Sequence, residues 1–195
     1  MSLDDLAIQP PAVLDAILRE TEQSGFAMAS EPKTGALLRV LAASKPGGRF
    51  LELGTGTGVG AAWLLDGMDS ASQLDTVDNN ADWQEIARRH LSNDLRIKFH
   101  TEDGAEFLKR VQQPYDFIFA DTWAGKFENL ELGLGLLRPG GMYVVDDLLP
   151  QDSWPEGHAG KIPGFVEALE RREDFISVKL AWGSGLMMAV RRSAH

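Results

Sequence analysis

The sequence predicts an α/β fold in which a doubly wound, mostly parallel sheet of seven strands ends in an antiparallel hairpin. From residue 49 onward, short apolar runs of strand length alternate with stretches of helix length that carry a 3.6-residue apolar stripe. Near the end, only Gly183-Ser184-Gly185 separates two further apolar runs. Because three residues cannot hold a crossover helix, these last two strands must pair as a hairpin.

The individual elements follow from the same pattern. The expected strands are Arg49–Leu53, Gln73–Asp78, Ile97–His100, Phe117–Ala120 and Met142–Val145, and then the hairpin strands Phe175–Trp182 and Leu186–Arg191. The helices expected between them are Gly60–Asp66, Ala81–Leu91, Gly104–Val111 and Phe127–Leu136.

Two segments flank this alternation. Upstream, Pro11–Glu22 and Pro32–Ala43 are expected helices with proline in the first turn, where a missing N–H costs nothing. Residues 1–48 would then form a helical cover over a sheet edge or the mouth of a site. Leu148–Pro163, rich in proline and glycine, is the most loop-like segment. It follows the fifth strand, where open α/β sheets bind their ligands.

Length and composition favour one globular domain over residues 1–195. The chain has 195 residues, 44% of them hydrophobic and 25% charged, which is close to globular averages and enough for a single core. Nineteen basic residues against 29 acidic ones give a formal charge of −10. Such a charge repels the phosphates of nucleic acids and anionic membrane surfaces. The sequence therefore argues against both as partners.

The absence of certain residue types narrows the chemistry. There is no cysteine, which removes disulfides, thiolate nucleophiles and cysteine-ligated metals. The first residues lack the basic start and apolar run of a secretion signal, and no stretch of about 18 apolar residues could cross a bilayer. We therefore expect a soluble cytoplasmic protein whose site is built from oxygen and nitrogen groups.

The most informative stretch runs from Phe50 to Gly60, where a strand leads into a glycine loop and then a helix. Glycines let the backbone approach a ligand closely, and the N–H groups of the helix point toward it. The dinucleotide pattern fails because Val59 stands where its third glycine would be, and no phosphate-loop lysine follows. Glu52, just before the loop, would repel a pyrophosphate but suits a ligand with an ammonium group. Its alternative is a partly exposed strand-end residue.

The next strand predicts a site for a ribose. It ends at Asp78, followed by Asn79, and an acidic side chain at this point can accept hydrogen bonds from both ribose hydroxyls. Asp75 is the competing carboxylate, but it lies inside the strand rather than at its end. The sequence therefore favours Asp78.

The ordered set of motifs resembles the class I S-adenosylmethionine-dependent methyltransferases. Their motif I, Glu-x-Gly-x-Gly-x-Gly, matches the loop of this chain and holds the amino-acid end of the cofactor. The segment after the third strand looks like the family's adenine side, although Asp103 is also a good helix N-cap. The resemblance implies a Rossmann-like methyltransferase fold and S-adenosyl-L-methionine as cofactor. The implied cofactor-binding residues are Met28, Glu52, Gly54, Thr55, Gly56, Gly58, Asp78, Asn79, Asp103, Gly104, Ala105 and Asp121.

Two further segments, Tyr115–Phe127 and Gly140–Asp147, are similar to motifs of the small O-methyltransferases of the catechol and caffeoyl-coenzyme A type. In those enzymes carboxylates after the fourth and fifth strands bind a divalent cation that holds the acceptor hydroxyls beside the cofactor. The resemblance assigns Asp121, Asp146 and Asp147 as ligands of Mg²⁺ or Ca²⁺, and hard oxygen ligands suit both ions. Without a cation, at least one of the three carboxylates should titrate high.

The chain departs from that family pattern at two positions. Asp147 replaces the usual asparagine, and Ala124 stands where the family commonly has a catalytic lysine. Lys126, two residues further on, either reaches the same space or is a surface lysine at the start of a helix. His158 in the loop after the fifth strand is a candidate base, with an ordinary solvated histidine as the alternative.

Other residues lie near the expected acceptor. Trp123 and Trp154 flank that site, where they either stack on a planar acceptor or pack in the core or a lid. The segment Met28–Gly35 resembles the part of the family that folds over the methyl end of the cofactor. The candidate catalytic residues are thus Asp121, Lys126 and His158.

The function we expect is O-methylation of a small hydroxylated acceptor with the assistance of a divalent cation, and aromatic compounds are one class of such acceptors. A phenol titrates near about 10, so a metal ion or a base must supply the phenolate at neutral pH. The alternatives are a non-catalytic S-adenosylmethionine-binding protein and an NAD(P)-dependent reductase. Val59 and the terminal hairpin argue against the reductase. A homodimer is compatible with the sequence, but no residue fixes the oligomeric state.

Overall fold

The computed structural model describes residues 8–193, so the ends of the predicted domain, residues 1–7 and 194–195, lie outside it. Seven strands form one sheet in the order β3-β2-β1-β4-β5-β7-β6. The strands are β1 Arg49–Leu53, β2 Gln73–Asp78, β3 Ile97–Thr101, β4 Tyr115–Ala120, β5 Leu137–Val145, β6 Phe175–Leu180 and β7 Leu186–Arg191. The helices are α1 Leu14–Ser24, α2 Pro32–Ala43, α3 Val59–Gly67, α4 Ala81–Leu91, α5 Gly104–Arg110, α6 Leu130–Gly135 and α7 His158–Glu170.

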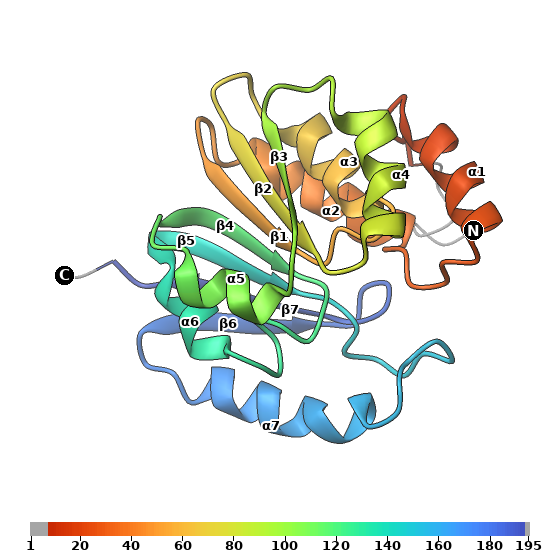
Figure 1. The fold of residues 1–195 in the computed structure, drawn as a ribbon. Coiled ribbons are helices and arrows are strands. Elements are labelled where there is room, and N and C mark those ends of the chain that lie inside the picture. The colour runs from red at the N-terminus through yellow and green to blue at the C-terminus, as the bar shows by residue number, and fades with distance from the viewer. Residues whose placement is uncertain (1–7, 194–195) are drawn as a thin grey trace.

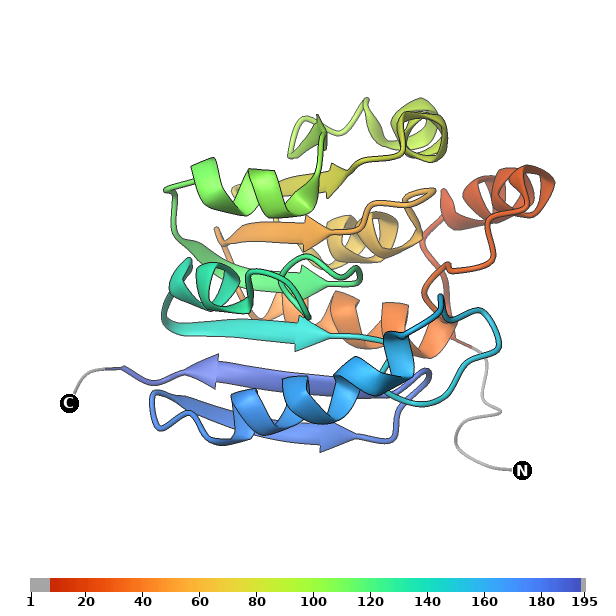
Figure 2. The ribbon, with the colours of Figure 1, turned by 60° about the horizontal axis from the view of Figure 1, so that its bottom comes forward.

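The direction of the strands gathers the predicted site at one edge of the sheet. Strands β1 to β5 are parallel, and β7 runs antiparallel to both β5 and β6. In register, Leu53 of β1 lies beside Val77 of β2 and Ala120 of β4. The carboxyl ends of the central strands therefore meet, and the connections before α2 and after β5 lie at that same edge (Figure 2). This confirms the predicted fold class and hairpin.

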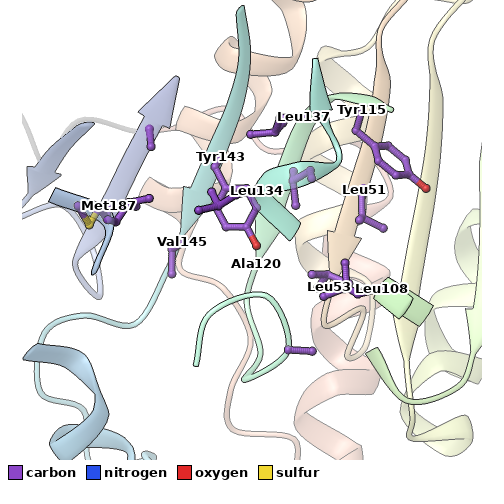
Figure 3. Packing of buried hydrophobic residues seen from close by; sticks show 14 of the residues in the cluster. Leu51, Leu53, Leu108, Tyr115, Ala120, Leu134, Leu137, Tyr143, Val145 and Met187 are labelled. Atoms are coloured by element: carbon purple, nitrogen blue, oxygen red, sulfur yellow. The ribbon is translucent and has the colours of Figure 1, made fainter. Parts of the chain in front are cut away.

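Helices cover both faces of the sheet (Figure 1). On one face, α1 to α4 bury Ile17, Leu38 and Trp63 in one cluster with residues of the strands, and α1 itself packs on α3 and α4. On the other face, α5 to α7 bury Phe107, Leu134 and Phe165. Figure 3 shows residues of this second layer. Because both faces are covered, the edge with the carboxyl ends is where a ligand can reach the sheet.

Several elements differ from the prediction at their ends; for example, α1 begins at Leu14 instead of Pro11, and β5 begins at Leu137 instead of Met142. Two of the differences lie beside the site. Helix α7 begins at His158 inside the segment that we expected to be a loop up to Pro163, and Pro163 lies within the helix. Helix α6 begins only at Leu130, not at Phe127. The residues before it form a turn in which the amides of residues 126, 127 and 128 all donate to the carbonyl of Trp123. Both differences alter the surroundings of the site.

Candidate active site

The glycine loop after β1 lies against the end of β4. Gly54 has a φ of 101°, and an added Cβ there would lie 2.8 Å from the main-chain oxygen of Asp121, so the position requires glycine. The amides of Gly54 and Thr55 donate to the carbonyl of Val77 at 2.9 and 3.1 Å. The loop is thus held between the ends of β2 and β4.

A cavity of about 270 Å³, here called the main cavity, opens beside this loop. Its walls come from the connection before α2, the glycine loop, the ends of β2 and β4, and the start of α7. The structure therefore brings together many of the residues that the sequence singled out. Of the predicted site residues, those that line the main cavity are Met28, Gly54, Thr55, Gly56, Asp78, Asn79, Asp121, Lys126, Asp147 and His158.

Asp78 holds the glycine loop from the end of β2 while it faces the main cavity. Its Oδ2 accepts a hydrogen bond from the amide of Gly56 at 2.7 Å, and its Oδ1 accepts one from the amide of Asn80 at 2.8 Å. Each carboxylate oxygen keeps a second lone pair for a ligand hydroxyl. Asp75, the competing carboxylate, instead accepts a hydrogen bond from Tyr115 at 3.0 Å. The position of Asp78 fits the ribose site that the sequence predicts.

Glu52 is buried beneath the loop, so the alternative of a partly exposed strand-end residue is wrong. Its side chain is 0% exposed, and its Oε2 accepts a hydrogen bond from the hydroxyl of Thr76 at 2.5 Å. Its Oε1 lies against Gly60. Burial raises the pKa of Glu52 to about 8. Glu52 does not line the main cavity. Its contact with the ammonium group of a ligand stays a prediction.

A second cavity of about 190 Å³, here called the side cavity, adjoins the main one. It lies between residues 27–31 and the loop after β5, which contributes Gln151, Ser153 and Trp154. Asp146 and Ser184 also line it. The two cavities share Met28, Ala29, Ser30, Asp121, Asp147 and Pro155. A molecule in one cavity would therefore meet a molecule in the other at Asp121 and Asp147.

Three carboxylates stand at this junction. Asp121 accepts a hydrogen bond from the hydroxyl of Ser30 at 3.1 Å, while Asp146 accepts one from the amide of Asp147 at 2.8 Å and another from the hydroxyl of Ser184. Asp147 has a φ of 63°, a left-handed conformation that is uncommon outside glycine. Burial raises the pKa of Asp146 to about 6. Burial and the charges of Asp146 and Asp147 hold the pKa of Asp121 well above its usual range.

Lys126 points into the protein, so the alternative of a surface lysine is wrong. Its side chain is 2% exposed, and its Nζ donates to the main-chain oxygen of Asp146 at 2.8 Å. Burial lowers the pKa of the ammonium group, and the carboxylates of Asp121, Asp147 and Asp146 oppose that shift. The sequence predicts a helix from Phe127, with Lys126 at its start on the surface. The structure has a turn at residues 126–128 instead, and this turn directs Lys126 into the protein.

His158 is likewise buried and is not a solvated loop residue. It is the first residue of α7 and is 3% exposed. Its Nε2 lies 3.1 Å from the carbonyl oxygen of Asp147, which can only accept, so Nε2 carries the hydrogen. The ring stacks on Trp154 with centroids 4.5 Å apart. Burial lowers the pKa of His158, which keeps the imidazole neutral at neutral pH.

The predicted adenine segment, Asp103 to Ala105, does not line the main cavity. Asp103 accepts hydrogen bonds from the amides of Ala105 and Glu106 at 2.9 and 3.0 Å, which confirms the alternative of an N-cap for α5. An added Cβ on Gly104 would lie 2.8 Å from the Cβ of Ala124. Gly58 lies equally close to α4, so it serves helix packing. A contact of Asp103, Gly104 or Ala105 with adenine stays a prediction.

The carboxylates do not fit the divalent-cation site that the resemblance implies. Between residues 8 and 193, no group of three histidine, aspartate or glutamate side chains is arranged to hold a metal ion. Mg²⁺ and Ca²⁺ need several oxygens that face one point. One oxygen of Asp146 is instead occupied by Ser184 and the Asp147 amide, and Lys126 binds the Asp146 main chain.

Comparison with known proteins identifies the family. A methyltransferase-domain family model matches residues 51–148. A protein of Mycobacterium sp. strain JLS, provisionally named an O-methyltransferase, is 34% identical over 166 residues, which cover 74% of this chain and 76% of the relative. A relative from Mycolicibacterium smegmatis with the same provisional name is 31% identical and covers 95% of this chain and 93% of its own. The chain belongs to the S-adenosylmethionine-dependent O-methyltransferases.

Solved structures agree with this family and its fold. An O-methyltransferase from Bacillus cereus in complex with SAH, the demethylated product, superposes with a TM-score of 0.81 at 25% identity and covers 97% of this chain and 95% of its own. TomG of Streptomyces achromogenes, solved with S-adenosylmethionine, has the same fold with a TM-score of 0.81 at 22% identity, over 97% and 94% of the two chains. Membership of this family excludes the nicotinamide-dependent reductase.

The sequence interpretation missed one aromatic pair in the wall of this O-methyltransferase's main cavity. Phe26 and Trp83 both line it, with ring centroids 4.7 Å apart and planes at 56°. Trp83 carried a signal, because it lies in the first turn of the helix that follows Asp78. Trp123 lines the main cavity and Trp154 the side cavity, and their contact with an acceptor stays a prediction. Through residues 8–193, no helix has the length and apolar character that crossing a membrane requires.

Proposed function

We propose that this O-methyltransferase binds S-adenosylmethionine in the main cavity and methylates a hydroxyl group of a small, planar acceptor in the side cavity. The observation that carries the proposal is the junction, where both cavities share Asp121 and Asp147. Transfer of a methyl group requires the acceptor oxygen and the methyl carbon to be in line and almost in contact. Two cavities that meet at a wall of carboxylates provide such a meeting point.

The main cavity has features that suit the cofactor. The glycine loop allows close approach of the backbone, and Asp78 has free lone pairs for ribose hydroxyls. Phe26 and Trp83 offer aromatic surface for the adenine ring. The carboxylates of Asp121 and Asp147 favour a ligand whose ammonium and sulfonium groups are positively charged.

The side cavity has features that suit a small hydroxylated acceptor. Trp154 provides a flat apolar wall, and Gln151, Ser153 and Ser184 provide polar groups around it. A planar ring can stack on the indole while its hydroxyl group faces the carboxylates. A cavity of about 190 Å³ limits the acceptor to a small molecule or to one small end of a larger molecule.

Asp121 is the residue we propose as the base. S-Adenosylmethionine supplies a methyl group already activated on a positive sulfur, so transfer is a direct displacement that leaves the carbon–sulfur electron pair on sulfur. The acceptor oxygen forms the new bond to carbon, and its proton passes to the carboxylate of Asp121. A carboxylate whose pKa is held above its usual range is a stronger base than an ordinary one.

The test combines an acceptor screen with one isosteric variant. We expect radiolabelled methyl transfer to some member of a panel of catechols and other hydroxylated aromatics, and Asp121→Asn should slow it by about 100-fold or more because the amide cannot take the proton. Asp66→Asn, an exposed position on α3, is the control. Calorimetry with SAH should show binding to all three proteins. Normal turnover by Asp121→Asn would exclude Asp121 as the base, and no SAH binding by the wild type would exclude the proposed function.

A further inference from the structure

We propose that the ammonium group of Lys126 is the resident cation of this site, and that it donates to the acceptor oxygen in place of a divalent metal ion. Methyl transfer by this chain would then need no divalent cation. The inference rests on the proposed function and extends it, because it names the group that holds the acceptor oxygen. Three observations on the described residues support it.

The first observation is that Lys126 has donors to spare. The ammonium group carries three N–H donors, and within residues 8–193 it makes one hydrogen bond, to the main-chain oxygen of Asp146 at 2.8 Å. Its side chain is 2% exposed and lines the main cavity beside Asp121 and Asp147. Two donors therefore remain for an oxygen atom that enters at the junction.

The second observation is the charge around Lys126. Lys126 lines the main cavity together with Asp121 and Asp147, and among the described residues that line the two cavities it is the only lysine or arginine. A buried carboxylate that stays ionised is stabilised by a cation nearby. Lys126 already provides one, and its Nζ also lies 5.2 Å from the ring centroid of Phe127, a distance at which aromatic rings attract cations.

The third observation is that Lys126 is held in place from the core. The turn that carries it is bound by Tyr143, whose hydroxyl donates to the carbonyl of Gly125 at 2.7 Å, and Tyr143 is 0% exposed. The ammonium group is therefore placed before any ligand arrives. A preorganised donor in a site shielded from water stabilises charge that develops on an oxygen during reaction.

Lys126 and a divalent ion would compete for the same carboxylates. A metal ion at the junction would lie close to a buried ammonium group and be repelled by it. An ion bound through Oδ1 of Asp146 would also have to displace the hydroxyl of Ser184 and the amide of Asp147, which both donate to that oxygen. The lysine thus explains why the three carboxylates are close together without forming a metal site.

Metal binding tests the inference without any acceptor. We would titrate Mn²⁺ into the wild type, Lys126→Met and Lys109→Met, and follow free Mn²⁺ by electron paramagnetic resonance. Lys109 is the matched control, since it is an exposed lysine paired with Glu106 on α5. We expect the wild type and the control to bind Mn²⁺ at least tenfold more weakly than Lys126→Met, whose carboxylates have lost their cation. Equal or tighter one-to-one binding by the wild type would overturn the inference.

Activity provides the second readout. With an acceptor from the screen, EDTA should change the wild-type rate by less than twofold, and Lys126→Met should lose at least a hundredfold in kcat while its affinity for SAH is kept. Lys126→Arg, which keeps the charge, should be more active than Lys126→Met, and circular dichroism would confirm that each variant folds. A rate abolished by EDTA and restored by Mg²⁺ would overturn the inference and leave the methyltransferase function intact. Failure to bind SAH would remove that function, and the Mn²⁺ titration would still decide the role of Lys126.

Discussion

At the scale of single residues, Asp78 combines two tasks that the sequence shows only in part. Its position at the end of a strand predicts a ribose contact. The structure adds that the same carboxylate binds the amide of Gly56 and so shapes the glycine loop. A substitution there would loosen the glycine loop, and under the proposed function it would also remove a contact with the ribose.

We expect Asp78→Ala to weaken the binding of S-adenosylmethionine by about 1–3 kcal/mol, the scale of lost charge-assisted hydrogen bonds. Isothermal titration calorimetry would measure it, with Asp82→Ala as the control because Asp82 is exposed in the first turn of α4. Asp78→Asn should bind better than Asp78→Ala, since the amide oxygen can still accept from Gly56. An affinity equal to that of the wild type in Asp78→Ala would remove the ribose assignment.

Some site residues could be located from the sequence and others could not. The two groups differ in which structural element orients the side chain. Asp78 is the last residue of β2 and Asp121 directly follows β4, so the strands alone place both at the edge of the sheet. Lys126 and His158 depend instead on where the next helix begins. Their identity was visible in the sequence, but their burial follows from a turn bound by Trp123 and Tyr143 and from the early start of α7.

At the scale of elements, the helix boundaries decided how much of the site could be predicted. Helix α4 has the predicted bounds because Asn80 caps it and its apolar stripe is regular. Helix α7 was missed, since Pro163 and the glycines around it are loop signals in sequence. Packing of Phe165 and Leu169 against the sheet stabilises this helix in spite of the proline.

Helix α5 offers a test of the two interpretations of Asp103. Asp103→Ala should lower the free energy of unfolding by about 1 kcal/mol through loss of the N-cap, and Asp103→Ser should largely retain it because serine caps equally well. Serine is too short to reach a ligand that aspartate contacts. We expect urea denaturation to show this rescue and SAH affinity to be the same in all three proteins. A serine variant of normal stability with clearly weaker affinity would instead assign an adenine contact to Asp103.

At the scale of the whole molecule, the burial of Glu52 in the central strand connects stability with pH. The pKa of Glu52 is about 8 in the folded protein, against 4.5 as its ordinary value. Between these values the folded state holds a proton that the unfolded state has released. The free energy of unfolding should therefore decrease as pH rises, by at most about 1.4 kcal/mol per pH unit from this group.

Glu52→Gln should remove this contribution, because glutamine is close in shape and does not titrate. Urea denaturation from about pH 5 to pH 8 would show a smaller decrease in the variant than in the wild type. Asp121 and Asp146 also have raised pKa values, so the difference between the two curves isolates Glu52. Glu167→Gln, at an exposed position on α7, should follow the wild type. Parallel curves for the wild type and Glu52→Gln would show that Glu52 is ionised in the folded protein.

The strand order also means that the strands are synthesised in a different order from the one in which they lie side by side in the sheet. Strand β6 is made before β7, yet β7 lies between β5 and β6. While the chain is still growing on the ribosome, β5 presents an open edge and β6 has no neighbour to join. Neither β5 nor β6 can complete its pairing until β7, Leu186–Arg191, has been synthesised. We therefore expect the nascent chain to depend on protection of that edge until β7 emerges, because an unpaired strand edge invites pairing with other chains.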